Sequence, residues 1–134
     1  MIGLDTNVLA RYLAQDDPDQ SARATQLIES LDDENPGFVS LVVLSELHWV
    51  LRRAYNVSRD DVATVVRRLL DATEIAVQEP DAVRRALSRP GPADFPDALI
   101  SELGVLAGCD YTATFDRRAA RLSGMKLVPA VGKR

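Results

Sequence analysis

The sequence predicts an α/β fold: a three-layer α/β/α sandwich around a central parallel sheet. Short apolar runs of two to four residues alternate along the chain with longer segments in which apolar residues recur every three or four positions. Most of these longer segments open on a capping side chain or a proline. Strands that are joined by helices run parallel and are covered by helices on both faces, which gives the three layers.

The elements follow in order. Asp5 ends the first strand, and a short helix passes through residues 9–13. Asp17 caps the next helix, with Pro18 at its first position. Ser40 and Ser58 cap the third and fourth helices. The expected strands are residues 1–4, 38–39, 75–77, 111–114 and 127–128, and the expected helices after the first are residues 18–31, 41–55, 59–70, 80–87, 96–107 and 116–122. The proline-rich loop 89–92 ends the fifth helix.

Size and composition predict a single cytoplasmic domain over residues 1–134. A chain of 134 residues with 46% hydrophobic and 27% charged residues is ordinary for one globular domain. No apolar run is long enough to span a bilayer, and no signal segment is recognisable. The single cysteine, Cys109, excludes an internal disulfide and a thiolate-rich metal site, and we expect it to be a small buried residue beside a turn.

The charge is distributed unevenly. Residues 1–61 hold 11 Asp and Glu against 5 Arg, a net charge of −6, whereas residues 62–134 hold 9 acids against 11 Lys and Arg, a net charge of +2. An acidic chain of this kind is a poor indiscriminate binder of nucleic acid. Arg supplies 14 of the 16 cations, however, and its planar fork suits phosphate.

Several catalytic designs are excluded by the residues that the chain lacks. His48 is the only histidine, which excludes a Ser-His-Asp triad and a two-histidine ribonuclease mechanism, and its apolar helix indicates a core or boundary position. No glycine-rich loop follows the first strand, so neither a P-loop nor a dinucleotide fold is supported.

Four acids instead occupy comparable places in the predicted fold. Asp5 and Asp116 follow strands, Asp97 lies in the first turn of a helix, and Glu46 lies in the third helix between two leucines. Strand ends and helix starts gather at one edge of a parallel sheet, so we expect Asp5, Asp97 and Asp116 to meet there, with Glu46 joining them. Carboxylates this close stay ionised only beside a cation, and oxygen ligands select Mg²⁺ or Mn²⁺. Such an ion activates a water to hydrolyse a phosphodiester.

Each acid also has a local interpretation. Asp5 and Asp116 are good helix caps, and Asp97 stands at the third position of a capping box that begins at Asp94. Glu46 is the hardest to explain locally, because a position between two leucines is not ordinary for a solvated acid. Four independent local explanations, one for each acid, are less probable together than one site that uses all four acids.

The residues resemble the PIN-domain nucleases, and within them the VapC-type toxins of toxin–antitoxin pairs. The resemblance covers the whole chain and is carried by four stretches in the family's order: Leu4-Asp5-Thr6-Asn7-Val8-Leu9, Ser45-Glu46-Leu47, Asp94-Phe95-Pro96-Asp97-Ala98-Leu99-Ile100 and Thr114-Phe115-Asp116-Arg117. Pro96 stands where smaller residues are common in the family, but a proline in the first turn leaves Asp97 undisturbed.

The resemblance implies a function and a set of site residues. It implies a Mg²⁺- or Mn²⁺-dependent endoribonuclease that cuts tRNA, rRNA or mRNA, a homodimer, and a cognate antitoxin that covers the acidic pocket. By position, Asp5, Glu46, Asp97 and Asp116 are the catalytic and metal-binding acids. Supporting roles fall to Thr6 and Asn7, which hold Asp5 by local hydrogen bonds, and to Thr114, whose hydroxyl orients the site.

Three other functions compete with a nuclease. A phosphoaspartyl phosphatase of the haloacid-dehalogenase type needs a second Asp two residues after the first, where this chain has Asn7. A receiver domain needs neighbouring acids at Asp5, although Lys126 matches its late lysine. A catalytically silent PIN-fold binding module is the remaining alternative, and gathering four acids without a function costs several kcal/mol per uncompensated charge.

Overall fold

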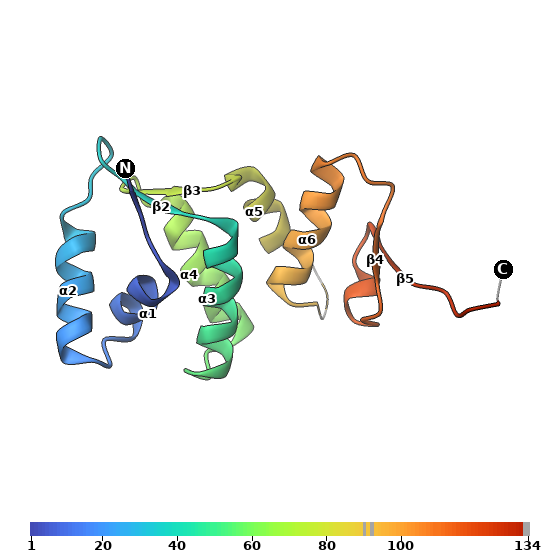
Figure 1. Ribbon diagram of the computed structural model, residues 1–134, viewed down its shortest axis with the longest axis horizontal. Helices are drawn as coiled ribbons and strands as arrows, with labels where there is room; N and C mark the ends of the chain where they lie inside the picture. Colours follow the sequence, from blue (N-terminus) through green and yellow to red (C-terminus); the bar gives the residue numbers. More distant parts are fainter. Residues whose placement is uncertain (90, 92, 133–134) are drawn as a thin grey trace. The chain divides into compact units, whose positions relative to one another are not determined.

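The computed structural model describes residues 1–89, 91 and 93–132 and divides the chain into two compact units, residues 1–80 and 81–134 (Figure 1). Pro90 and Pro92 of the predicted loop lie outside the described residues. Each unit is built from parallel strands and helices, as the sequence predicts. In the described part of the chain, no helix has the length and apolar character needed to cross a membrane.

The first unit holds a three-stranded parallel sheet in the order β1-β2-β3. In chain order its elements are β1 (Ile2–Gly3), α1 (Thr6–Ala14), α2 (Pro18–Glu29), β2 (Gly37–Val39), α3 (Leu41–Arg53), α4 (Arg59–Asp71) and β3 (Ile75–Val77). The register pairs Gly3 with Phe38 and Phe38 with Ala76. Helix α1 packs against α2 and α3, and α4 packs against α3 and β3.

The helix starts of this unit are set by the predicted side chains. Asp17 accepts a hydrogen bond from the Gln20 amide, Ser40 from Val43, and Ser58 from Asp61. These side chains satisfy amides that the helix itself leaves without an acceptor. The starts of α2, α3 and α4 are therefore fixed by local sequence.

The core of the first unit lies between the sheet and its helices. It is built from side chains that are at most 4% exposed: Leu4, Leu9, Val39, Leu44, Leu47, Val62 and Val66. Gly37 lets this core close on β2, because a Cβ there would stand 2.7 Å from the Leu4 side chain. His48 is 1% exposed in α3 and packs edge-on against the Trp49 ring, which confirms its prediction as a core residue.

The second unit contains α5 (Pro80–Leu87), α6 (Phe95–Leu106), β4 (Thr112–Thr114), a 3₁₀ turn η1 (Ala119–Arg121) and β5 (Met125–Leu127). Strands β4 and β5 form a parallel pair in which Thr112 faces Met125. Helix α6 approaches β4 through Gly104, where an added Cβ would stand 2.6 Å from the Thr112 hydroxyl oxygen. A glycine is therefore required for this contact.

Two expectations for the second unit are wrong. The helix predicted over residues 116–122 is only the single turn η1: the Asp116 carboxylate accepts from the amides of Arg118 and Ala119, as a helix cap does, but the backbone is already extended at Leu122. Cys109 is exposed rather than buried. It follows Gly108, whose φ of +86° turns the chain away from α6 after its last residue.

Candidate functional site

Asp5 stands at the carboxyl end of β1 and caps α1. Its backbone is extended, and its carboxylate accepts a hydrogen bond of 2.9 Å from the Thr6 amide. The Asp5 side chain is nevertheless exposed, so it is available to a ligand as well as to the helix. The predicted cap and an exposed carboxylate thus coexist at this strand end.

The two residues after Asp5 differ in their surroundings. Thr6 holds the Asp5 carboxylate through its backbone amide, whereas its hydroxyl oxygen is buried and meets no hydrogen-bond partner among the residues that the structure describes. Thr6 as a whole is 4% exposed. Asn7 is exposed on the surface of α1. The hydrogen bond from the Thr6 amide is a local bond of the predicted kind, and no bond from Asn7 to Asp5 is found among the contacts of the described residues.

Glu46 lies on the exposed surface of α3. Its neighbours Leu44 and Leu47 are fully buried, so they lie on the opposite side of the helix from solvent. The expectation that two flanking leucines make an exposed acid unusual was therefore wrong, because a helix turns about 100° per residue and places Glu46 on another face. Since α3 packs against α1, Asp5 and Glu46 belong to neighbouring elements of the first unit.

In the second unit, Asp116 lies close enough to Asp97 for its negative charge to affect the pKa of Asp97. Asp97 is partly buried in the first turn of α6. Burial raises the pKa of its carboxyl above the ordinary value, and the negative charges of Asp116 and Asp94 raise it further, against a smaller opposing effect of the backbone hydrogen bond to Asp94. The structure therefore brings together two of the four predicted acids and adds Asp94 beside them.

Asp94 itself is not the cap that the sequence indicates. It occupies the N-cap position of α6, but its side chain makes no capping hydrogen bond. The Asp97 amide instead bonds to the Asp94 backbone oxygen at 3.0 Å. The half of the capping box that the Asp94 side chain would supply is therefore absent, whereas the Asp97 carboxyl keeps a hydrogen bond with the Asp94 backbone, which lowers its pKa.

Thr114 fixes the loop that carries Asp116. Its hydroxyl oxygen accepts a hydrogen bond of 3.0 Å from the Asp116 amide, while one Asp116 carboxylate oxygen accepts from Arg118 and Ala119 at 2.8 and 3.2 Å. This geometry holds the Asp116 side chain in one orientation after β4.

An ion-pair network surrounds the buried Glu102 side chain in the second unit. Glu102 of α6 is 7% exposed and accepts hydrogen bonds from Arg89 at 3.1 Å and from Arg85 at 3.4 Å. Arg89 also donates to the Ser123 backbone oxygen, as does the buried Ser101 hydroxyl. The network therefore ties α6, which carries Asp97, to the segment that follows Asp116. Sequence reasoning missed it, since charged residues far apart in the chain give no local pattern.

Comparison with known families decides the class of protein. The sequence matches the PIN domain over residues 2–125, which is most of the chain. The chain belongs to the PIN domain family. No curated protein matches it at the significance applied.

Membership settles the coarse features of fold and activity. A PIN domain is an α/β/α sandwich with a parallel sheet, and the parallel pairings observed in both units agree with that class. PIN domains are typically metal-dependent nucleases, and those nucleases generally use divalent metals such as Mg²⁺.

The donor chemistry of this PIN domain fits a hard divalent cation. Asp97 and Asp116 offer only carboxylate oxygens, and their mutual repulsion would be relieved by a positive charge between them. Within neither unit do the described residues gather three or more His, Cys, Asp or Glu side chains into a group that could hold a metal. The second unit thus supplies two carboxylate ligands, Asp97 and Asp116, which do not form a complete metal site by themselves.

Proposed function

We propose that this PIN domain is a Mg²⁺- or Mn²⁺-dependent endoribonuclease, and that residues 1–134 work as one domain. The observation that carries the proposal is the match to the PIN domain over residues 2–125, together with the partly buried Asp97 beside Asp116, a pair of carboxylates whose charge a cation would neutralise. Family membership supports nuclease activity, and RNA is the substrate that the resemblance to VapC-type toxins implies.

We assign the acids one shared task. Asp5, Glu46, Asp97 and Asp116 would hold the metal, and Thr114 would keep Asp116 in its orientation. When bound, Mg²⁺ or Mn²⁺ supplies Lewis-acid chemistry, which lowers the pKa of water and offsets the charge of a phosphodiester. The Asp5 carboxylate, steadied by the Thr6 amide, stays exposed to receive ligands.

The biological setting belongs to the same proposal. A VapC-type toxin would act in the cytoplasm as a homodimer, and a cognate antitoxin would inhibit it by covering the acidic residues. The support for this is the ordered set of four sequence stretches around Asp5, Glu46, Asp97 and Asp116. A small neighbouring gene that encodes a DNA-binding head and a basic, hydrophobic tail would strengthen this assignment.

The test is cleavage of labelled RNA by the purified full chain with Mg²⁺, with Mn²⁺ and with a chelator. We expect metal-dependent cuts in single-stranded RNA, and loss of cutting in Asp5→Asn, which removes charge with almost no change of volume. Asp33→Asn, an exposed acid in the turn before β2, is the matched control and should cut normally. Undiminished cleavage by Asp5→Asn would refute the site assignment, and a wild-type chain that cuts no nucleic acid would favour a silent binding module.

A further inference from the structure

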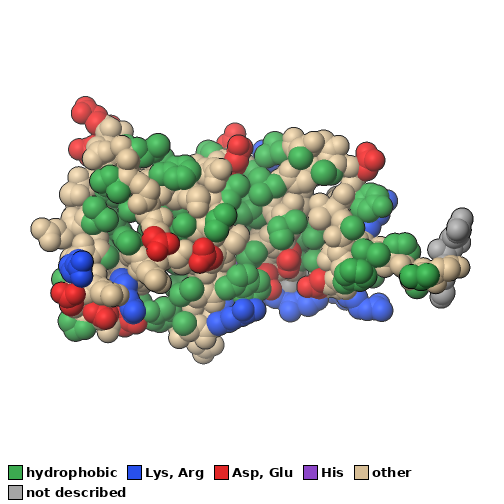
Figure 2. All heavy atoms as spheres, in the orientation of Figure 1, with side chains coloured by type: hydrophobic (Ala, Val, Ile, Leu, Met, Phe, Trp, Pro, Cys, Tyr) green, Lys and Arg blue, Asp and Glu red, His purple; other side chains and the backbone are tan. Residues whose placement is uncertain are grey.

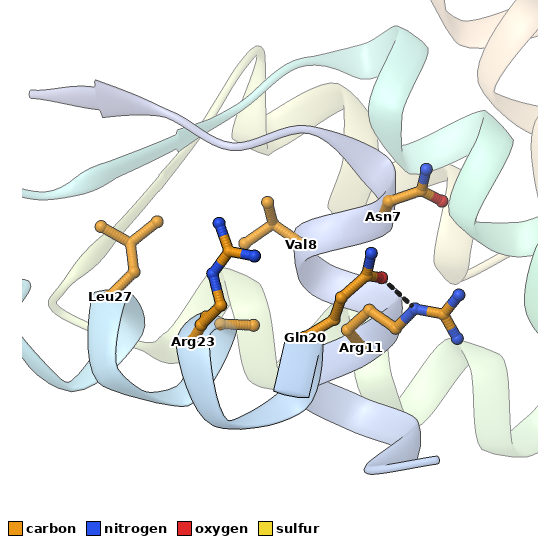
Figure 3. A pocket seen from close by; sticks show the side chains of 7 residues that line it. Asn7, Val8, Arg11, Gln20, Arg23 and Leu27 are labelled. Atoms are coloured by element: carbon orange, nitrogen blue, oxygen red, sulfur yellow. Dashed lines mark hydrogen bonds between the residues drawn. The ribbon is translucent and has the colours of Figure 1, made fainter. Parts of the chain in front are cut away.

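A groove with a volume of about 410 Å³ lies between α1 and α2 of the first unit (Figure 3). This volume is within the range of about 300–1,000 Å³ that is typical of sites for small organic ligands. Among the residues that the structure describes, those that line the groove belong to these two helices. None of the acids assigned above to the metal lines it, so it is a separate feature of the surface.

The lining combines an apolar floor with polar and cationic side chains. Val8 of α1 and Leu27 of α2 supply apolar surface, while Asn7 and Gln20 supply amide groups that both donate and accept hydrogen bonds. In Figure 3, Arg23 extends from α2 into the middle of the groove toward Val8. An apolar face, amide groups and a guanidinium are the chemistry that binds a base and its phosphate.

The two arginines of the groove have different roles. Arg11 is held in place, because it donates to both Asp16 carboxylate oxygens at 3.1 Å and to the Gln20 side-chain oxygen at 2.8 Å. Arg23 makes a single contact of 3.4 Å with Asp19, and the two side chains are 76% and 79% exposed. An ion pair this exposed is weak, so Arg23 can exchange Asp19 for a phosphate at little cost.

The position of the groove favours a ligand that also reaches Asp5. Acidic and basic side chains are mixed over the end of the first unit that holds α2 (Figure 2), so the groove has no strong field of either sign. It begins at Asn7, the second residue of α1, and Asp5 caps that same helix. A chain that occupies the groove therefore starts within two residues of Asp5.

We propose that the groove between α1 and α2 binds one nucleotide of single-stranded RNA, with its base on Val8 and Leu27 and its phosphate on Arg23. The inference rests on the proposed function for its choice of RNA. An unpaired base suits the groove best, because a base in a duplex must first be unstacked and unpaired before it can enter, which weakens binding. The amides of Asn7 and Gln20 face the base edge and would make the site selective among bases.

Binding of RNA by the full chain in metal-free buffer tests the site without cleavage. The probe is a fluorescent single-stranded RNA of about 12 nucleotides, titrated by anisotropy over a series of salt concentrations. Arg23→Gln should weaken binding about tenfold, and should lower the slope of log K against log salt by about 0.7, the value for one phosphate contact to a single strand. Arg67→Gln, an exposed arginine on α4, is the charge-matched control and should change neither quantity.

A second variant changes charge and keeps shape. Gln20→Glu still accepts the hydrogen bond from Arg11 but places a carboxylate in the groove, so it should also weaken RNA binding severalfold. Gln26→Glu, exposed on the same helix and outside the lining, is its control. Thermal melting of all four variants checks that each is folded.

The outcomes separate this site from the proposed function. Unchanged RNA affinity in both Arg23→Gln and Gln20→Glu would show that the groove does not bind RNA, and a protein segment would then be the remaining candidate ligand. Wild-type protein with no measurable affinity for the probe overturns it as well. Weakened binding in both variants, with normal controls, supports the site, even if the wild type cuts no RNA, in which case the proposed nuclease function alone fails.

Discussion

The acids of the first unit and those of the second are held in different ways. Asp5 and Glu46 are exposed, one as a helix cap and one on a helix surface. Asp97 is partly buried and feels the charge of Asp116, which is itself fixed by three hydrogen bonds. The second unit therefore holds Asp97 against the negative charge of Asp116, which a metal would offset, and the first unit offers carboxylates that are open to solvent.

The largest expected effect is on cleavage by Asp97→Asn. Removing the more strongly coupled acid should lower the rate at least about 100-fold, because stabilisation by a metal is worth several kcal/mol. Glu46→Gln, which removes an exposed acid, should cost less, about tenfold. Rates of RNA cleavage with saturating Mn²⁺ measure both, with Asp81→Asn in the first turn of α5 as the control. If Glu46→Gln lost more cleavage rate than Asp97→Asn, the exposed acid of the first unit would be the more important of the two for catalysis, contrary to this expectation.

The next effect concerns the network that supports the second unit. Arg89→Met should lower the free energy of unfolding by about 3 kcal/mol, because it leaves the buried Glu102 carboxylate with only the longer contact to Arg85. Urea denaturation measures the change. Adding Glu102→Met should restore most of the lost stability, since a buried apolar pair replaces a buried ion pair without penalty. A double variant as unstable as the single one would show that the network does not act through Glu102.

A smaller effect separates charge repulsion from capping at Asp97. The raised pKa means that the folded chain binds the Asp97 proton more tightly than the unfolded chain does. Ionised Asp97 therefore costs stability above its folded pKa and costs nothing below its ordinary pKa. Metal-free Asp97→Asn should melt about 1–3 °C higher than wild type near pH 7, and the gain should vanish near pH 3. A lower melting temperature at neutral pH would indicate that Asp97 supports α6 as a helix acid.

The smallest effect is at Asp16, a carboxylate of the first unit whose pKa moves the other way. A hydrogen bond from the Tyr55 hydroxyl and another from Arg11 hold the pKa of Asp16 below its ordinary value, against partial desolvation. This contribution to stability is present above the ordinary pKa and is lost as the pH falls through the folded one. Tyr55→Phe should shift the acid unfolding transition slightly toward higher pH, as measured by circular dichroism. An unchanged transition would show that Arg11 alone determines the shift.

The sequence predicts those parts of the fold that depend on near neighbours. The caps Asp17, Ser40 and Ser58 are found where the pattern places them, because each bonds an amide three residues away. Asp116 likewise accepts from the amides of Arg118 and Ala119, as the pattern predicts for a cap, but the helix that follows is a single turn that ends at Leu122. The start of a helix depends on near neighbours, whereas its length depends on packing that the local pattern does not contain.

The site is predicted from sequence in part. Asp97 and Asp116 lie 19 residues apart in the chain and interact in the structure, as equivalent strand and helix ends suggest. The contribution of Asp94 to this charge cluster was assigned to capping instead, and the support from Arg89 and Glu102 was not foreseen. These contacts depend on the three-dimensional path of the chain around α6, and the spacing of residues in the sequence does not specify that path.

Binding of Mn²⁺ to four proteins tests most directly whether the two pairs of acids form one metal site. The four are wild type, Asp5→Asn, Asp97→Asn and the double variant, each titrated by calorimetry. A shared site predicts that either single change removes most of the affinity and that the double variant is little worse than a single one. Additive losses, or an Asp5→Asn protein that binds Mn²⁺ as wild type does, would contradict the account.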